Sequence, residues 1–137
     1  MNLIAGEIKD LLKAHDYGYP VSVVRTFSES AKVFPRIVVS QVNDSTGIRT
    51  ANKEHVSMLA FQIEIYTQDA VDKNGKVTSR VDVSDQITEQ VDDLMYARYK
   101  MNRDSVTEDT RYAIDTVRRI IRYSCAIDEF GYTYRTI

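Results

Sequence analysis

The stretch SMLAFQIEIYTQ at residues 57–68 decides the fold class, because apolar and polar side chains alternate along it with the two-residue period of a β-strand. The apolar residues on one face are Leu59, Phe61, Ile63 and Ile65, and the other face is mixed: Met58, Ala60, Gln62, Glu64 and Tyr66. Successive side chains of a strand point to opposite sides of the sheet, so we expect one side to be buried and the other at least partly wet. The sheet is therefore expected to carry a helix layer on one side.

Further strand patterns lie on both sides of this stretch. A short one covers residues 21–24, a β-branched one covers 36–42 after Pro35, and the run VRRIIRYSCAID at 117–128 alternates well. Residues 132–137 are β-like in composition and follow a turn at 128–131, which predicts a C-terminal hairpin. Residues 101–116 are ambiguous, and a helix over 117–128 is the alternative to a strand there.

Two helices are expected. A helix over residues 2–14 is predicted by apolar side chains at helical spacing: Leu3, Ile4, Ile8, Leu11 and Leu12. A second helix begins near residues 81–84, with Ser84 as its N-cap, and ends near 99–100. Its apolar face is marked by Ile87, Val91, Leu94 and Met95.

Residues 69–80 form a polar stretch whose Asn74-Gly75 pair suits a tight turn, so a small hairpin between Val71 and Val77 is expected, with a mobile surface loop as the alternative. The whole order is α-β-β-β-α-β-β. This order predicts an α+β fold, a mostly antiparallel β-sheet with two α-helices packed on one face. The 137 residues contain no visible linker, which favours a single domain over 1–137.

The polar run NDSTGIRTANKEHV at residues 43–56 is expected to be a long loop between two strands. Connections in compact domains have a median of about 4–6 residues, and long loops are usually functional or disordered. This loop is therefore the most informative segment of the chain for function.

Composition excludes several classes of protein. Apolar residues make up 43% and charged residues 28%, which argues against disorder throughout, collagen-like repeats and a disulfide scaffold. The net charge of −2 argues against a general nucleic-acid or anionic-membrane binder. No basic start precedes an apolar run, no apolar run is long enough for a membrane span, and Cys125 is the single cysteine. We expect an intracellular, reduced protein without a membrane partner.

Motifs of catalysis are not found in the sequence. The phosphate-binding glycine motifs and the nucleophile elbow do not occur, and His15 and His55 lack metal-ligand spacing and are interpreted as surface residues. Cys125 lies within an alternating apolar run and is interpreted as a packed thiol. We therefore expect no enzyme activity, no cofactor and no metal. The alternative is a metal-dependent nuclease that uses the central carboxylates Glu64, Asp69, Asp72, Asp82, Asp85, Glu89, Asp92 and Asp93, although the helical ones are spaced so that they spread around a solvated face.

Basic residues gather after this acidic region, at Arg118, Arg119 and Arg122. Arg118 and Arg122 share a strand parity, so both point to one side and could bind phosphate or a neighbour's carboxylates. Head-to-tail self-assembly, in which the acidic side of one subunit meets the basic side of the next, is one hypothesis. Unrelated surface charges are the alternative.

The order of these segments resembles the tail terminator, or head-to-tail joining, proteins of long-tailed bacteriophages. The segments that carry the resemblance are the N-terminal helix, the strand FPRIVV at 34–39, the long polar loop, the strand FQIEIY at 61–66, the second helix and the strand RRIIRYSCAID at 118–128. The resemblance covers nearly the whole chain. It rests on the order of segments, since no diagnostic catalytic motif is involved.

The resemblance implies a structural virion protein that assembles in the host bacterial cytoplasm and is located at the head–tail junction. Such proteins form a ring, expected to be hexameric, that caps the tail tube, ends its polymerisation and joins the tail to the head connector. The implied partners are further copies of the chain, the tail tube protein and the head–tail connector or stopper protein, with DNA only passing through the channel. Another neck protein, either a connector adaptor or a stopper, is the alternative, and a cellular regulatory or scaffold domain also remains open.

On this interpretation the contacts with the tail tube or the adjacent subunit are assigned to two groups of residues. The first is in the polar loop: Ile48, Arg49, Asn52, Lys53 and His55. The second is the arginine pair Arg118 and Arg122.

Overall fold

The structure is a computed structural model that describes residues 4–25, 33–48, 56–128 and 133–134. The helices are α1 (Ile4–Ala14) and α2 (Arg80–Tyr99). The strands are β1 (Ser22–Val24), β2 (Arg36–Ile48), β3 (Val56–Thr67), β4 (Ala70–Val71), β5 (Val77–Thr78), β6 (Asn102–Ala113), β7 (Thr116–Asp128) and β8 (Thr133–Tyr134).

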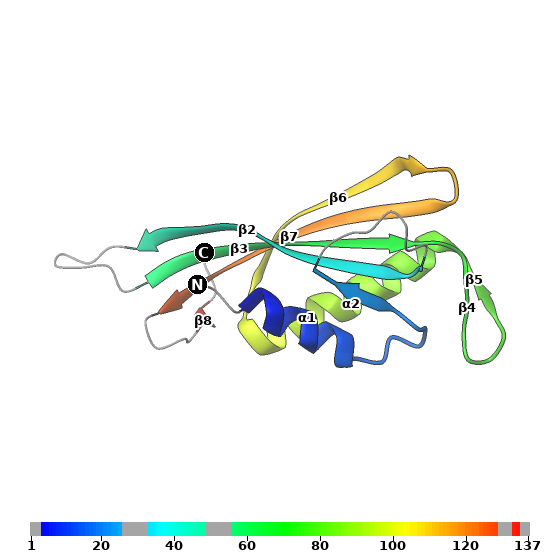
Figure 1. The fold of residues 1–137 in the computed structure, drawn as a ribbon, viewed down its shortest axis with the longest axis horizontal. Coiled ribbons are helices and arrows are strands. Elements are labelled where there is room, and N and C mark those ends of the chain that lie inside the picture. Colours follow the sequence, from blue (N-terminus) through cyan, green and yellow to red (C-terminus); the bar gives the residue numbers. More distant parts are fainter. Residues whose placement is uncertain (1–3, 26–32, 49–55, 129–132, 135–137) are drawn as a thin grey trace.

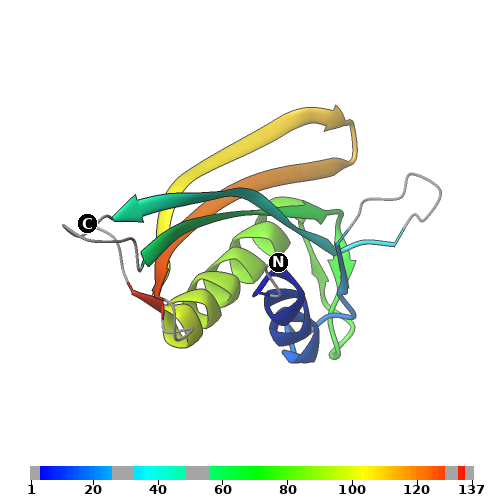
Figure 2. The same ribbon diagram turned by 60° about the vertical axis from the view of Figure 1, so that its left-hand side comes forward.

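The main sheet has the strand order β1-β2-β3-β7-β6, with β8 also paired to β7, and a small separate hairpin is formed by β4 and β5. Among the described strands, β1 and β2 form the one parallel pair, and the other pairs are antiparallel. Both helices lie on the same side of the sheet, and α2 packs on it (Figures 1 and 2). The predicted α+β fold is confirmed.

The core lies between the helices and one face of the sheet. The strand residues predicted to face inward, Leu59, Phe61, Ile63 and Ile65, are at most 2% exposed. They pack with Ile8 and Leu12 of α1 and with Ile87, Val91 and Met95 of α2 in one cluster. Burial of each such side chain contributes roughly 1.5–3 kcal/mol, so this cluster sets which face of the sheet is covered.

The polar segment 43–56 is not a loop over its whole length, which corrects the sequence interpretation. Strand β2 continues to Ile48, and its second half pairs with β3 from Asn43↔Ala60 to Ile48↔Val56. Strand ladders are held by backbone groups, so a polar side-chain pattern does not prevent pairing when a partner strand is available. Residues 49–55, the rest of the predicted loop before Val56, lie outside the described residues.

The ambiguous segment 101–116 contains strand β6, which pairs with β7 along most of its length. Its sequence NRDSVTEDTRYA has few apolar residues, so the alternation that marks a half-buried strand is missing. The alternative of a helix over 117–128 is wrong, because these residues form β7.

Two of the smaller sequence predictions are confirmed and one is wrong. Val71 pairs with Val77 in the β4–β5 hairpin, whose turn contains Gly75 at φ 81°. The C-terminal hairpin exists as β7 paired with β8. Helix α2, however, begins at Arg80 with Ser79 as its N-cap, whose side chain accepts from the Asp82 N–H. Ser84 is buried inside the helix.

Neither of the two described helices is long and apolar enough to cross a membrane.

Candidate functional site

Strand β7 sends two consecutive arginines to opposite faces of the sheet. Arg118 lies on the face away from the helices, which we call the open face, and Arg119 lies on the helix side, where it contacts α2. Each guanidinium is held by two carboxylates from other strands or from the helix. At this point Arg118 joins neighbouring strands of the sheet, and Arg119 joins the sheet to α2.

On the open face, Arg118 joins three strands. Its Nε donates to Glu64 Oε1 of β3 at 3.0 Å, and its Nη1 lies 3.4 Å from Asp109 Oδ2 of β6. A further hydrogen bond joins Arg118 Nη2 to Glu64. Tyr66 completes the cluster: its hydroxyl accepts from Arg118 Nε at 3.2 Å, and its ring packs edge-on against Tyr112 with a centroid separation of 5.1 Å.

The electrostatics of this cluster favour the charged form of Arg118 and the neutral form of Tyr66. Burial acts to lower the pKa of Arg118, but the hydrogen bond and charge of Glu64 outweigh it and raise the pKa above its ordinary value. Burial, with the charge of Glu64, raises the pKa of Tyr66. Arg118 therefore stays protonated and Tyr66 stays neutral at ordinary pH.

On the helix side, Arg119 joins the sheet to α2. Its Nη1 lies 2.8 Å from Asp85 Oδ1 and donates to Thr88 Oγ1 at 3.1 Å, and its Nη2 lies 2.8 Å from Glu108 Oε1 of β6. Burial acts to lower the pKa of Arg119, but its bonds to Glu108 and Asp85 raise it. This arginine is a structural tie between the helix and the last two strands.

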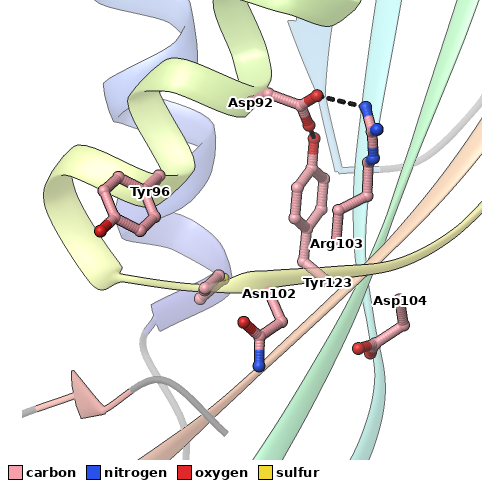
Figure 3. A pocket seen from close by; sticks show the side chains of 7 residues that line it. Asp92, Tyr96, Asn102, Arg103, Asp104 and Tyr123 are labelled. Carbon is pink, nitrogen blue, oxygen red and sulfur yellow. Dashed lines mark hydrogen bonds and ion pairs between the residues drawn. The ribbon is translucent and has the colours of Figure 1, made fainter. Parts of the chain in front are cut away.

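An open hollow of about 580 Å³ lies where α2 ends and β6 begins (Figure 3). At its wall Asp92 accepts from the Tyr123 hydroxyl and from Arg103, as the dashed lines in Figure 3 mark. Burial, and then the hydrogen bond to Asp92, raise the pKa of Tyr123. The remaining lining residues are Tyr96, Met101, Asn102 and Asp104. The carboxylate of Asp92 is therefore already engaged by two donors of its own chain.

The structure describes only some of the residues that were predicted to form an interface. Ile48 is the last residue of β2 and pairs with Val56, whereas Arg49, Asn52, Lys53 and His55 lie outside the described residues. Arg118 and Arg122 do share the open face, as their parity predicts. Within the described part of the chain, Arg122 makes a hydrogen bond to Gln62 Oε1 at 3.3 Å and no ion pair.

The structure corrects the idea of separate acidic and basic sides. The acidic and basic runs are distant in sequence, but Arg118 meets Glu64, Arg119 meets Asp85, and Arg103 meets Asp92 in space. The sheet registers and the position of α2 interleave the two signs. Charge segregation is therefore no basis for head-to-tail assembly, although Arg122 remains open to a neighbour.

The central carboxylates are not gathered at one point. Asp69 Oδ1 accepts from the Arg80 N–H at 2.8 Å, while Glu64, Asp85 and Asp92 lie in the three arginine clusters above. Among the described residues, no three His, Cys, Asp or Glu side chains are grouped so that they could hold a metal ion. His15, the described histidine, has its Nε2 2.7 Å from Gln90 Oε1. Cys125 is fully buried, as the packed-thiol interpretation predicts, and burial raises its pKa to about 11.

Sequence reasoning missed the acidic partners of the arginines and the edge strand β6. Asp109, Glu108 and Arg103 all belong to β6, the segment left ambiguous. The position and length of residues 102–113 could have predicted β6. The strand expected at 117–128 needs a partner strand, and consecutive elements of a chain are usually neighbours in space. Residues 102–113 lie directly before it, after the predicted second helix, and have a similar length.

No protein-family model matches this chain, and the search of curated proteins finds no significant match.

Proposed function

We propose that this chain is a structural protein of a bacteriophage neck, which assembles as a ring, caps the tail tube, ends tail polymerisation and joins the tail to the head connector. The proposal rests on the resemblance in the order of segments. It is supported by one structural observation: among the described residues, no strand pairs with the outer side of β6, and neither helix covers the face of the sheet opposite α1 and α2 (Figure 2). Such surfaces are suited to contacts with other protein chains.

The open face also suits a protein that DNA passes without being held. Strong phosphate binding needs several unneutralised Lys or Arg side chains. On the open face Arg118 is paired with Glu64 and Asp109, which leaves Arg122 as the arginine of β7 on that face without an ion pair to a described residue. Protein contacts, rather than DNA contacts, are thus the chemistry that this surface offers.

The proposal is tested by removing the gene from the source phage and examining the products by negative-stain electron microscopy. A tail terminator is expected to leave filled heads without tails, together with free tails of unregulated length, and a plasmid copy should restore joined particles. Normal tails that fail to bind filled heads would indicate a connector adaptor or stopper instead. Normal, infectious particles would contradict a neck function.

A further inference from the structure

We infer that the β4–β5 hairpin is a flap whose tip is latched by the ion pair between Lys73 and Asp16, and that breaking this pair opens a cleft between the hairpin and residues 16–20. The inference is independent of the neck proposal, because it concerns a movement within a single chain. The hairpin stands apart from the main sheet, beside the end of α1 (Figures 1 and 2). It therefore lacks the neighbouring strands that fix the position of the long strands.

The base of the hairpin is held firmly on both sides. Thr67 Oγ1 donates to the Arg80 carbonyl at 2.8 Å, and Asp69 Oδ1 accepts from the Arg80 N–H at 2.8 Å. Ala70, the first residue of β4, also packs against the core cluster. A movement of the flap is therefore a pivot about Ala70 and its partner Thr78, where the two strands leave this base.

The tip of the hairpin is closed on itself by short-range hydrogen bonds. Asp72 Oδ1 accepts from the N–H groups of Asn74 and Lys76 at 2.8 and 3.0 Å. The Asp72 carbonyl accepts from the Gly75 N–H at 3.0 Å, and the Asp72 N–H donates to the Lys76 carbonyl at 3.0 Å. Because these bonds stay within the tip, the flap keeps its shape when it turns and moves as one body.

Little besides the latch joins the tip to the rest of the described structure. None of residues 71–78 is buried, and the cross-strand pair Val71 and Val77 is 57% and 65% exposed. Among the described residues, the Lys73–Asp16 pair is the one hydrogen bond or ion pair that joins 71–78 to another element. A two-stranded hairpin is marginally stable in water by itself, so a single bond at its tip shifts the balance between closed and open positions.

The carboxylate of Asp16 is oriented toward Lys73 by the chain around it. Its Oδ1 accepts from the Gly18 N–H at 2.9 Å, and its Oδ2 lies 2.9 Å from Lys73 Nζ. The hydrogen bonds from Lys73 and Gly18 hold the pKa of Asp16 below its ordinary value, so the carboxylate is charged at neutral pH. Both side chains of the pair are 71% exposed, so salt screens their attraction and the latch is weak enough to open.

Two hollows lie at the latch, with volumes of about 230 and 390 Å³. Tyr19 and Lys73 belong to the lining of both hollows, so the side chain that reaches Asp16 is part of the wall between them. Release of Lys73 removes this wall, and the two hollows join into one cleft between residues 16–20 and 71–74.

A distance measurement between two spin labels tests the latch in the full-length purified protein. The labels are attached to Lys13→Cys on α1 and Lys76→Cys near the hairpin tip, and pulsed electron spin resonance gives the distribution of their separation. The native Cys125 is fully buried, and the protein without the two introduced cysteines controls for it. Asp16→Asn keeps the Oδ1 acceptor for Gly18 and loses the charge. We expect it to raise the ratio of long to short separations about two- to fivefold.

Three comparisons separate the latch from general effects of charge. Asp10→Asn removes an exposed carboxylate of α1 that has no ion pair with a described residue, and it should leave the ratio unchanged. In a Lys73→Gln background, Asp16→Asn should have no further effect, because the pair is already broken. Salt at about 1 M, where the Debye length is about 3 Å, should raise the ratio in the protein with the intact pair and leave Asp16→Asn unchanged.

The outcomes decide the inference in either direction. The same distribution in the native, Asp16→Asn and Lys73→Gln proteins would overturn it, and so would equal shifts from Asp10→Asn and Asp16→Asn. Additive effects of Asp16→Asn and Lys73→Gln would show that the two side chains act separately, which also contradicts a latch. Non-additive shifts that occur only when a member of the pair is replaced, and that salt reproduces, support it. The neck proposal is decided by the phage particles and stands or falls apart from these results.

Discussion

Arg118 and Glu64 stabilise each other on the open face, where the side chain of Glu64 is only 12% exposed. Arg118→Met leaves this carboxylate without its cation, so we expect the free energy of unfolding to fall by about 1–3 kcal/mol. Urea denaturation measures the loss. Arg122→Met is the matched control on the same strand and face, because Arg122 is exposed and makes no ion pair with a described residue; its effect should stay within about 0.5 kcal/mol. Equal effects of the two substitutions would contradict the assigned role of Arg118.

Tyr123 makes stability depend on alkaline pH. Its pKa is raised by burial and by Asp92, so the folded protein keeps the phenol protonated where the unfolded chain loses the proton. Its contribution is therefore present below pH 10, the ordinary pKa of tyrosine, and is lost as the pH rises above that value. Tyr123→Phe should make the decline of the melting temperature above pH 10 less steep. An identical decline in both proteins would show that Tyr123 does not carry the effect.

The sequence analysis predicted Ser84 as the N-cap of helix α2, whereas the N-cap in the structure is Ser79. Ser79 and Ser84 both precede apolar residues, and only the β4–β5 hairpin before Arg80 decides which one caps the helix. Ser79→Ala should lower the free energy of unfolding by about 1 kcal/mol through loss of the cap. Ser84→Ala should leave it unchanged or raise it, because the buried Ser84 hydroxyl has no hydrogen-bond partner among the described residues. The reverse order in thermal melts would argue against the assigned helix start.

The arm formed by the outer halves of β2 and β3 can be tested separately from the core. Asp44 pairs directly with Leu59, so replacing residues 45–58 by Asn-Gly closes the hairpin with a two-residue turn. The core strand residues Phe61, Ile63 and Ile65 lie beyond this cut, and cooperative unfolding should persist. We expect the shortened protein to fail in joining tails to heads when it is supplied to phage that lack the native gene. Full rescue of infectious particles would remove the arm, including Ile48, from the proposed contacts.

At the scale of elements, strong periodicity predicted the structure well and weak periodicity did not. Residues 57–68 and 117–128 alternate clearly and form β3 and β7, because each buries one face under the helices. Strand β6 lies at a sheet edge and most of its described side chains are exposed, and the second half of β2 is polar in sequence, so both segments carry little strand signal.

At the scale of the whole molecule, sequence predicted the α+β architecture but not which charges meet. Parity placed Arg118 and Arg122 on one face, which is a local property of β7. The pairing of Arg118 with Glu64 and Asp109 depends on the strand order β3-β7-β6, and no local pattern contains that order. The hypothesis of separate acidic and basic sides failed for this reason.

The central claim is that the protein is part of the phage neck, and its position in the particle tests this most directly. Intact particles from the source culture are labelled with gold-conjugated antibody against the purified chain and imaged by negative-stain electron microscopy. The account predicts gold at the junction of head and tail, on particles of the native phage and not on particles that lack the gene. Unlabelled particles, with the protein recovered only from the soluble fraction of the cells, would contradict it.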